Sequence, residues 1–153
     1  MPDNSTTSNT GRQAIDPRGP RFGAVLTTVV LALALLLIST PAGLVLVAWQ
    51  TLVFGLGAIV GLQAQPYGIV FRRLVRPRLA PPRELEDSAP PRFAQAVGLV
   101  FLVVALVALL AGATLVATIA VAMALAAAFL NAAFNFCLGC EMYLLWARVR
   151  PAR

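Results

Sequence analysis

Two cysteines, three positions apart near the end of the chain, are the residues whose types and spacing most readily suggest chemistry. Cys137 and Cys140 are the two cysteines of the sequence, and Glu141 follows them directly. Residues three and four apart share a helix face, so two sulfurs and a carboxylate could converge. A CxxC pair can cycle between dithiol and disulfide, or accept and pass on sulfane sulfur, if one thiol ionises readily. Cys137 and Cys140 are therefore a candidate redox pair, with Glu141 as a candidate modulator.

The reactivity of this pair depends on the helix that carries it. An apolar stretch runs from residue 115 to residue 146, and as one straight helix it would be close to 50 Å long, too long for the hydrocarbon core of a membrane. A break between Asn131 and Asn135 would make Asn135 the N-cap of a short following helix, with Cys137 in its first turn, where the helix dipole favours thiolate. A continuous, tilted helix would put the cysteines near its C-terminal end, where the dipole opposes ionisation. The two arrangements predict opposite reactivity.

Three other interpretations of the cysteines need consideration. Cysteine is a small apolar residue common in packed helices, and Gly139 could simply admit a close neighbour. A metal site would have too few ligands, because two thiolates and Glu141 fall short of a tetrahedral site and the sequence has no His. A structural disulfide is not expected at a site that faces the reducing cytosol. We therefore predict no metal and no cofactor, and packing cysteines stay open as the alternative.

The composition indicates which elements must position the pair. Of the 153 residues, 59% are hydrophobic and 12% charged, which is outside the usual range of a soluble domain. The sequence contains four long apolar stretches. Each is long enough, or nearly so, to span a core about 30 Å thick, and none contains a charge before Glu141. Short turns join the first stretch to the second and the third to the fourth. We predict an all-α integral membrane four-helix bundle built from two antiparallel hairpins. Its expected spans are residues 22–39, 42–62, 93–111 and 115–146, within a domain of residues 15–150 that follows a disordered arm of residues 1–14.

The distribution of charge predicts the orientation. All basic residues are Arg, and they lie in the N-terminal arm, in the connection of residues 63–92 or in the C-terminal tail, while the two tight turns carry no charge. The positive-inside rule then predicts a multi-pass protein of a plasma membrane with both termini in the cytoplasm. The use of Arg in place of Lys is a hint of a GC-rich bacterial genome.

The central connection contains an amphipathic segment. Tyr67, Phe71 and Leu74 fall on one helical arc, and the arginines fall on the other. The segment predicts an interfacial helix whose basic face meets anionic headgroups of the lipid bilayer. A solvated basic loop is the alternative, and we expect no nucleic-acid partner, because polar and aromatic interleaving is missing. The candidate membrane-surface residues are Arg72, Arg73, Arg76 and Arg78.

Two further patterns concern assembly. Asp16 to Phe22 and Asp87 to Phe93 share an Asp, a Pro-Arg-Phe run and a following apolar stretch, which suggests either a parallel repeat or chance. Gly57 and Gly61 give the second helix a small-residue face for packing within the bundle or in a homodimer. Polar residues of the spans, Gln50 among them, are expected to form hydrogen bonds between helices.

These motifs together resemble a known family. The segments from Ile15 to Phe22, from Gln65 to Tyr67 and from Asn135 to Glu141 are similar to bacterial membrane proteins catalogued as domain of unknown function 4395. The resemblance implies the four-helix fold and an association with thioredoxin-like or sulfurtransferase (rhodanese-like) proteins. The chain also resembles the four-helix quinone-coupled disulfide oxidoreductases, but it has one cysteine pair instead of two, so no catalytic residues carry over.

Two functions follow as hypotheses. One is a thiol-redox or sulfur-relay accessory of the membrane that uses Cys137 and Cys140. The other is a non-enzymatic membrane scaffold or assembly partner in which both cysteines only pack. Whether the protein is an enzyme stays open at this point.

Overall fold

The computed structural model describes residues 13–150, and this part of the chain is almost entirely helical. The arm predicted to be disordered lies, except for its last two residues, outside the described residues. One short strand precedes each of the two long helical hairpins. In chain order the elements are β1 (Ala14–Ile15), α1 (Arg18–Leu36), α2 (Pro41–Gly55), η1 (Leu56–Val60), α3 (Pro66–Val70), η2 (Phe71–Val75), η3 (Arg76–Arg78), β2 (Glu86–Asp87), α4 (Ala89–Leu110), α5 (Thr114–Phe134) and α6 (Leu138–Val149).

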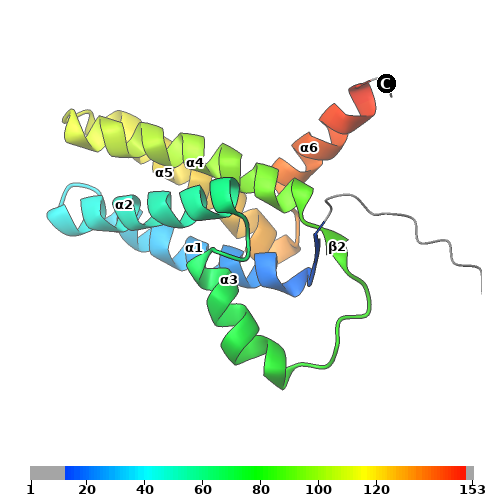
Figure 1. The fold of residues 1–153 in the computed structure, drawn as a ribbon. Coiled ribbons are helices and arrows are strands. Elements are labelled where there is room, and N and C mark those ends of the chain that lie inside the picture. Colours follow the sequence, from blue (N-terminus) through cyan, green and yellow to red (C-terminus); the bar gives the residue numbers. More distant parts are fainter. Residues whose placement is uncertain (1–12, 151–153) are drawn as a thin grey trace, which may run out of the picture.

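The four long helices lie side by side, and the short helices α3 and α6 leave the same end of the bundle in different directions (Figure 1). The predicted all-α helical bundle is thus confirmed. Its core is apolar and small-residue rich: Leu31, Val47, Leu102 and Val121 are fully buried, with alanines of α4 and α5 between them. Alanine lets helices approach closely, which suits packing in lipid, where apolar side chains gain little from leaving the solvent.

The outer surface of the bundle is also apolar. Leu36, Leu110 and Leu115 are 81%, 71% and 74% exposed, and exposed Val and Ile side chains follow the long helices between them. Four helices, Arg18–Leu36, Pro41–Val60, Ala89–Leu110 and Thr114–Phe134, are long and apolar enough to cross a membrane. Apolar surface of this extent is an aggregation hazard in water, and four such helices are compatible with a multi-pass membrane protein.

Helix starts are set by proline and by side-chain caps. The first and third long helices begin at Arg18 and Ala89, a turn before the expected spans, because Pro20 and Pro90 are tolerated in a first turn. Helix α2 begins at Pro41, and the Thr40 hydroxyl accepts a hydrogen bond from the Gly43 amide at 3.3 Å. The turn between α4 and α5 uses Gly112 at a φ of 78°, a conformation that favours glycine.

The two halves of the chain make matching contacts at the end where α3 and α6 emerge. Arg21 of α1 donates to the Ala132 carbonyl near the end of α5, at 3.3 Å. Its counterpart in the sequence repeat, Arg92 of α4, donates to the Ala58 and Ile59 carbonyls near the end of η1, at 2.8 and 2.6 Å. Each arginine thus satisfies carbonyls that a helix end leaves without an intrahelical partner.

The match extends to the strands and to the short helices. Strands β1 and β2 pair antiparallel, and Ile15 lies opposite its repeat counterpart Glu86. Phe22 contacts Phe71, and Phe93 contacts Tyr143, both with ring centroids 5.7 Å apart. In each half, therefore, the short helix after the second long helix packs on the first turns of the first one. These contacts favour the repeat interpretation over chance.

The connection predicted to hold an interfacial helix is helical from residue 66 to residue 78, through α3, η2 and η3. Tyr67 and Phe71 are buried against α1, whereas Leu74 is exposed. Pro66 opens the helix and Pro77 lies in its final 3₁₀ turn. Its location at a membrane surface stays a prediction.

Gln50 of α2 forms hydrogen bonds to two other helices, as predicted. This side chain is fully buried, donates to the Thr27 hydroxyl of α1 at 3.0 Å and accepts from the Tyr67 hydroxyl at 2.9 Å. Trp49 in turn donates to the Tyr67 oxygen at 3.1 Å. The four residues tie α1, α2 and α3 together.

The two glycines predicted to form a packing face have different surroundings. Gly57 faces the Gln95 side chain of α4 within the chain, whereas a side chain at Gly61 would meet open space. The homodimer through these glycines stays a prediction.

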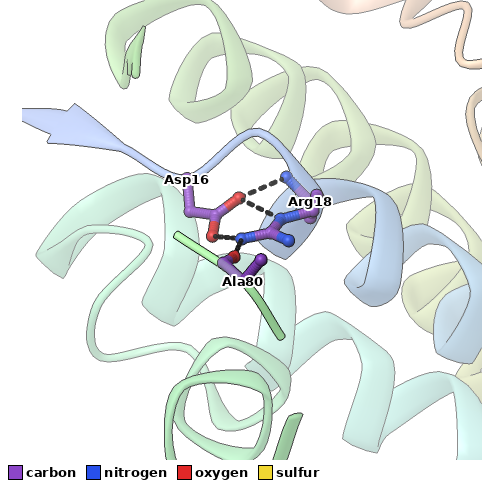
Figure 2. Close-up of polar contacts among 3 residues, drawn as sticks. All are labelled: Asp16, Arg18 and Ala80. Atoms are coloured by element: carbon purple, nitrogen blue, oxygen red, sulfur yellow. Dashed lines mark hydrogen bonds and ion pairs between the residues drawn. The ribbon is translucent and has the colours of Figure 1, made fainter. Parts of the chain in front are cut away.

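Asp16 ties the start of α1 to the central connection. Its carboxylate accepts from the amide and the guanidinium of Arg18 at 2.9 to 3.0 Å, and Arg18 also donates to the Ala80 carbonyl at 3.0 Å (Figure 2). The hydrogen bonds from the Arg18 side chain hold the pKa of the Asp16 carboxyl below its usual value, although burial opposes the shift.

Asp16→Asn is expected to lower the free energy of unfolding by about 1 to 2 kcal/mol near neutral pH. Because the folded-state pKa is depressed, this contribution is complete above the unfolded value of about 3.9 and is lost as the pH falls through the lower folded value. Thermal unfolding of both proteins in detergent between about pH 2 and 7 measures it. Exposed Glu84→Gln is the control, and a deficit that does not shrink in acid would contradict the ion pair.

Candidate functional site

The last apolar stretch breaks where the cysteine pair begins. Helix α5 ends at Phe134, and Asn135 is its C-cap in the left-handed conformation, with φ 54°. Cys137, not Asn135, is the N-cap of α6, because its sulfur accepts a hydrogen bond from the Cys140 amide at 3.3 Å. The prediction that Asn135 caps the second helix was therefore wrong. Asparagine tolerates the left-handed region better than most residues, and it closes the first helix instead.

Cys137 and Cys140 form a disulfide with their Cα atoms 5.2 Å apart. This separation is inside the range that a disulfide needs, so the turn at the start of α6 accommodates the bond. The sequence predicts no structural disulfide at a site that faces the cytosol, and the structure differs from that prediction. The helix break makes the bond geometrically available, because the extended backbone of Cys137 brings its sulfur back to the third residue of α6. Both residues are half-buried.

Gly139, inside the CxxC, brings the start of α6 onto α4. A side chain at this position would have its Cβ 2.6 Å from the Cα and Cβ of Ala94, closer than such atoms approach. The close neighbour anticipated for Gly139 is therefore the backbone of α4. Phe93, the preceding residue, packs against Tyr143 and stacks on Trp146, with ring centroids 5.7 and 6.5 Å apart. Residues of α4 thus fix the disulfide at one end of the bundle.

The disulfide lies at a pocket of about 460 Å³. This volume is within the range of small-molecule sites. The pocket enters the bundle from the end where α6 begins, between α1, α4 and α5, and reaches Thr27, Phe54 and Gly98. Small side chains of α5, such as Ala124 and Ala128, line its inner part. The two sulfurs are therefore next to a cleft rather than sealed in packed helices.

The charged groups of this pocket lie around its opening. Arg21, Glu86, Asp87 and Glu141 line it together with both cysteines. Glu141 is exposed in the first turn of α6 and lines the same pocket as the two cysteines. Its carboxylate makes no hydrogen bond within residues 13–150 that the structure records, and its role as a modulator stays a prediction. Among the described residues, no three His, Cys, Asp or Glu side chains gather as a metal site. Arg21 and Ala94 were missed by sequence reasoning, although the Pro-Arg-Phe repeat marked the segment of Arg21.

The arrangement agrees with a comparison against protein families. A family model described as a domain of unknown function, DUF4395, matches residues 15–148. The chain belongs to this family. The match runs from β1 to the last turn of α6, so the DUF4395 domain includes both hairpins and the disulfide pocket. No curated protein and no solved structure matches the chain. A function for this DUF4395 protein must therefore be argued from the site itself.

Proposed function

We propose that this DUF4395 protein carries out thiol–disulfide exchange at a membrane surface through Cys137 and Cys140, as an accessory to a thioredoxin-like or sulfurtransferase partner. The observation that carries the proposal is the position of the pair: a half-buried CxxC at the start of α6, at the opening of a pocket. A cysteine that only fills space in packed helices has no need of a pocket or of a helix N-terminus.

Local structure favours Cys137 as the sulfur that exchanges. After reduction, a thiolate at Cys137 would lie at the N-terminus of α6, where amides such as that of Cys140 point toward it. Helix N-termini stabilise thiolates. Cys140, in the first turn, is placed to attack a mixed disulfide on Cys137.

The exchange balances as a two-electron transfer. A partner thiolate attacks Sγ of Cys137, the bond between Cys137 and Cys140 breaks, and Cys140 leaves as a thiolate that takes up a proton. The second partner thiolate then attacks the partner sulfur of the mixed disulfide and releases Cys137. The partner dithiol is oxidised to a disulfide, and the cysteine pair is reduced to a dithiol.

Single-cysteine variants test the assignment. In detergent at neutral pH, Cys140→Ser, which keeps Cys137, is expected to form a mixed disulfide with glutathione disulfide about 10-fold faster than Cys137→Ser. Mass spectrometry follows both reactions, and each variant unfolded in denaturant provides the reference rate of an unstructured thiol. Equal rates for the two folded variants would contradict the role given to the helix N-terminus.

A second arm tests the partner class. Purified thioredoxin, with its reductase and NADPH, is expected to reduce the wild-type disulfide with NADPH consumption of one equivalent per chain, and the Cys137→Ser/Cys140→Ser variant should consume none. A disulfide that resists thioredoxin while the folded protein is intact would favour the scaffold hypothesis, in which the bond only braces the start of α6.

A further inference from the structure

A second pocket lies at the start of α1, and its Ile15 and Asp16 are the repeat counterparts of Glu86 and Asp87 in the disulfide pocket. It holds about 230 Å³ between the β1 segment, the first turn of α1, the loop after η1 and the helix of residues 66–78. Its polar lining includes Gln63, Gln65, Arg72 and Arg76, and no cysteine of the described chain lines it. This pocket therefore offers a chemistry of binding rather than of redox exchange.

The charge of this pocket is positive. Asp16 is its one acidic lining residue within the described chain, and its carboxylate oxygens already accept from Arg18 (Figure 2). Arg72 donates to the Gln63 carbonyl at 2.6 Å, which holds its guanidinium over the loop. Neither Arg72 nor Arg76 forms an ion pair with an acidic residue in the part of the chain that the structure describes. Arg76 lies near enough to the Asp16 carboxyl to help lower its pKa, but neither guanidinium is held in an ion pair among the described residues, so both can turn to an anion.

The pocket lies where the uncharged part of the bundle ends. Gly19 and Pro20 of its lining belong to the first turn of α1, and after Arg21 the helix carries no charge through Leu36. Val70 and Leu74 of the adjoining helix expose apolar side chains beside the arginines. With the long helices spanning a bilayer, this level is that of the phospholipid headgroups.

We infer that this pocket binds the phosphate headgroup of an anionic phospholipid, with Arg72 and Arg76 as its ligands. Guanidinium groups match phosphate oxygens in charge and in geometry. The volume suits a headgroup rather than a larger molecule, and the acyl chains would extend along the apolar side chains outside. Gln63 and Gln65 add amide groups that can hydrogen-bond a glycerol headgroup. This site is separate from the proposed thiol exchange and does not depend on it.

A pair of double variants tests the inference against general surface charge. Short-chain phosphatidylglycerol is titrated into the protein in zwitterionic detergent, and bound lipid is counted by native mass spectrometry. Arg72→Gln/Arg76→Gln is expected to weaken binding about 10-fold or more. Arg73→Gln/Arg78→Gln removes the same charge from the same helix but leaves the pocket lining unchanged, and it should bind within about threefold of wild type. Equal losses in the two double variants would overturn the site.

Two further measurements decide the source of the phosphate and guard against misfolding. Phosphatidylcholine of the same chain length should bind at least about 10-fold more weakly than phosphatidylglycerol. Soluble glycerol 3-phosphate should compete only weakly, because it lacks the acyl chains, and competition as strong as that of the lipid would overturn the membrane assignment. Circular dichroism and the lipid-free melting temperature of both double variants must match wild type for the comparison to count. Arg72→Lys/Arg76→Lys, which keeps the charge, should recover part of the binding.

Discussion

Gly139→Ala is expected to release the start of α6 from α4 and to lower the free energy of unfolding by about 2 to 3 kcal/mol. The new Cβ would lie 2.6 Å from both the Cα and the Cβ of Ala94, and a backbone atom cannot move aside as a flexible side chain does. The helix must shift, and the disulfide moves with it. Thermal unfolding and the rate of thiol exchange in detergent should both change.

The control for this substitution is another helical glycine with room beside it. At Gly55 of α2, the nearest atom to an added Cβ is Leu99 Cδ1 at 3.8 Å, so Gly55→Ala should leave stability unchanged or raise it slightly. Combining Gly139→Ala with Ala94→Gly removes one of the two clashing atoms and should restore part of the lost stability. If Gly139→Ala were as stable as Gly55→Ala, the close contact of α6 with α4 would be refuted.

Gln50→Ala is expected to destabilise the bundle by about 2 kcal/mol or more. The change leaves a cavity in fully buried surroundings and removes the acceptor of the Tyr67 hydroxyl and the donor to Thr27. Since these hydrogen bonds join α3 to the two helices of the first hairpin, hydrogen exchange of the α3 amides should rise more than that of α5. Thermal unfolding gives the global loss.

Tyr67→Phe separates the cavity from the lost hydrogen bonds. It keeps the ring but leaves the Gln50 oxygen and the Trp49 indole without the hydroxyl they share, so about 1 kcal/mol should be lost. A Thr28→Ala variant is the matched control, because the Thr28 hydroxyl bonds only its own helix, at the Ala24 carbonyl. Equal losses at Tyr67 and Thr28 would show that the network does not join the helices.

The sequence predicted most of what hydrophobic patterning controls. Apolar stretches joined by short turns predicted the bundle, and the length of the last stretch made a break close to Asn135 one of two alternatives, which the structure bears out. The orientation predicted from the arginines stays a prediction. The capping residue was predicted wrongly, because Asn is favourable both as an N-cap and in the left-handed conformation, and the choice depends on where α6 docks. That docking depends on the contact of Gly139 with Ala94, which periodicity does not reveal.

The pocket and the helix-capping arginines lay beyond sequence reasoning for a similar reason. Arg21 and Arg92 were read as part of the topology signal, yet each donates to carbonyls of a helix distant in sequence. Such contacts follow from how the hairpins pack, and charge counting carries no information about them. The Pro-Arg-Phe repeat was the one signal that marked both residues, and the equivalent contacts give that signal a physical meaning.

An equilibrium redox titration of the purified protein in lipid nanodiscs tests the central claim most directly. The protein is incubated with defined ratios of reduced and oxidised dithiothreitol, then quenched with acid, and its free thiols are alkylated and counted by mass. Exchange chemistry at Cys137 and Cys140 predicts one reversible two-electron transition, with the same midpoint from the reduced and the oxidised side. A pair that stays in one state at every ratio, or reforms its disulfide only after unfolding, would contradict the account.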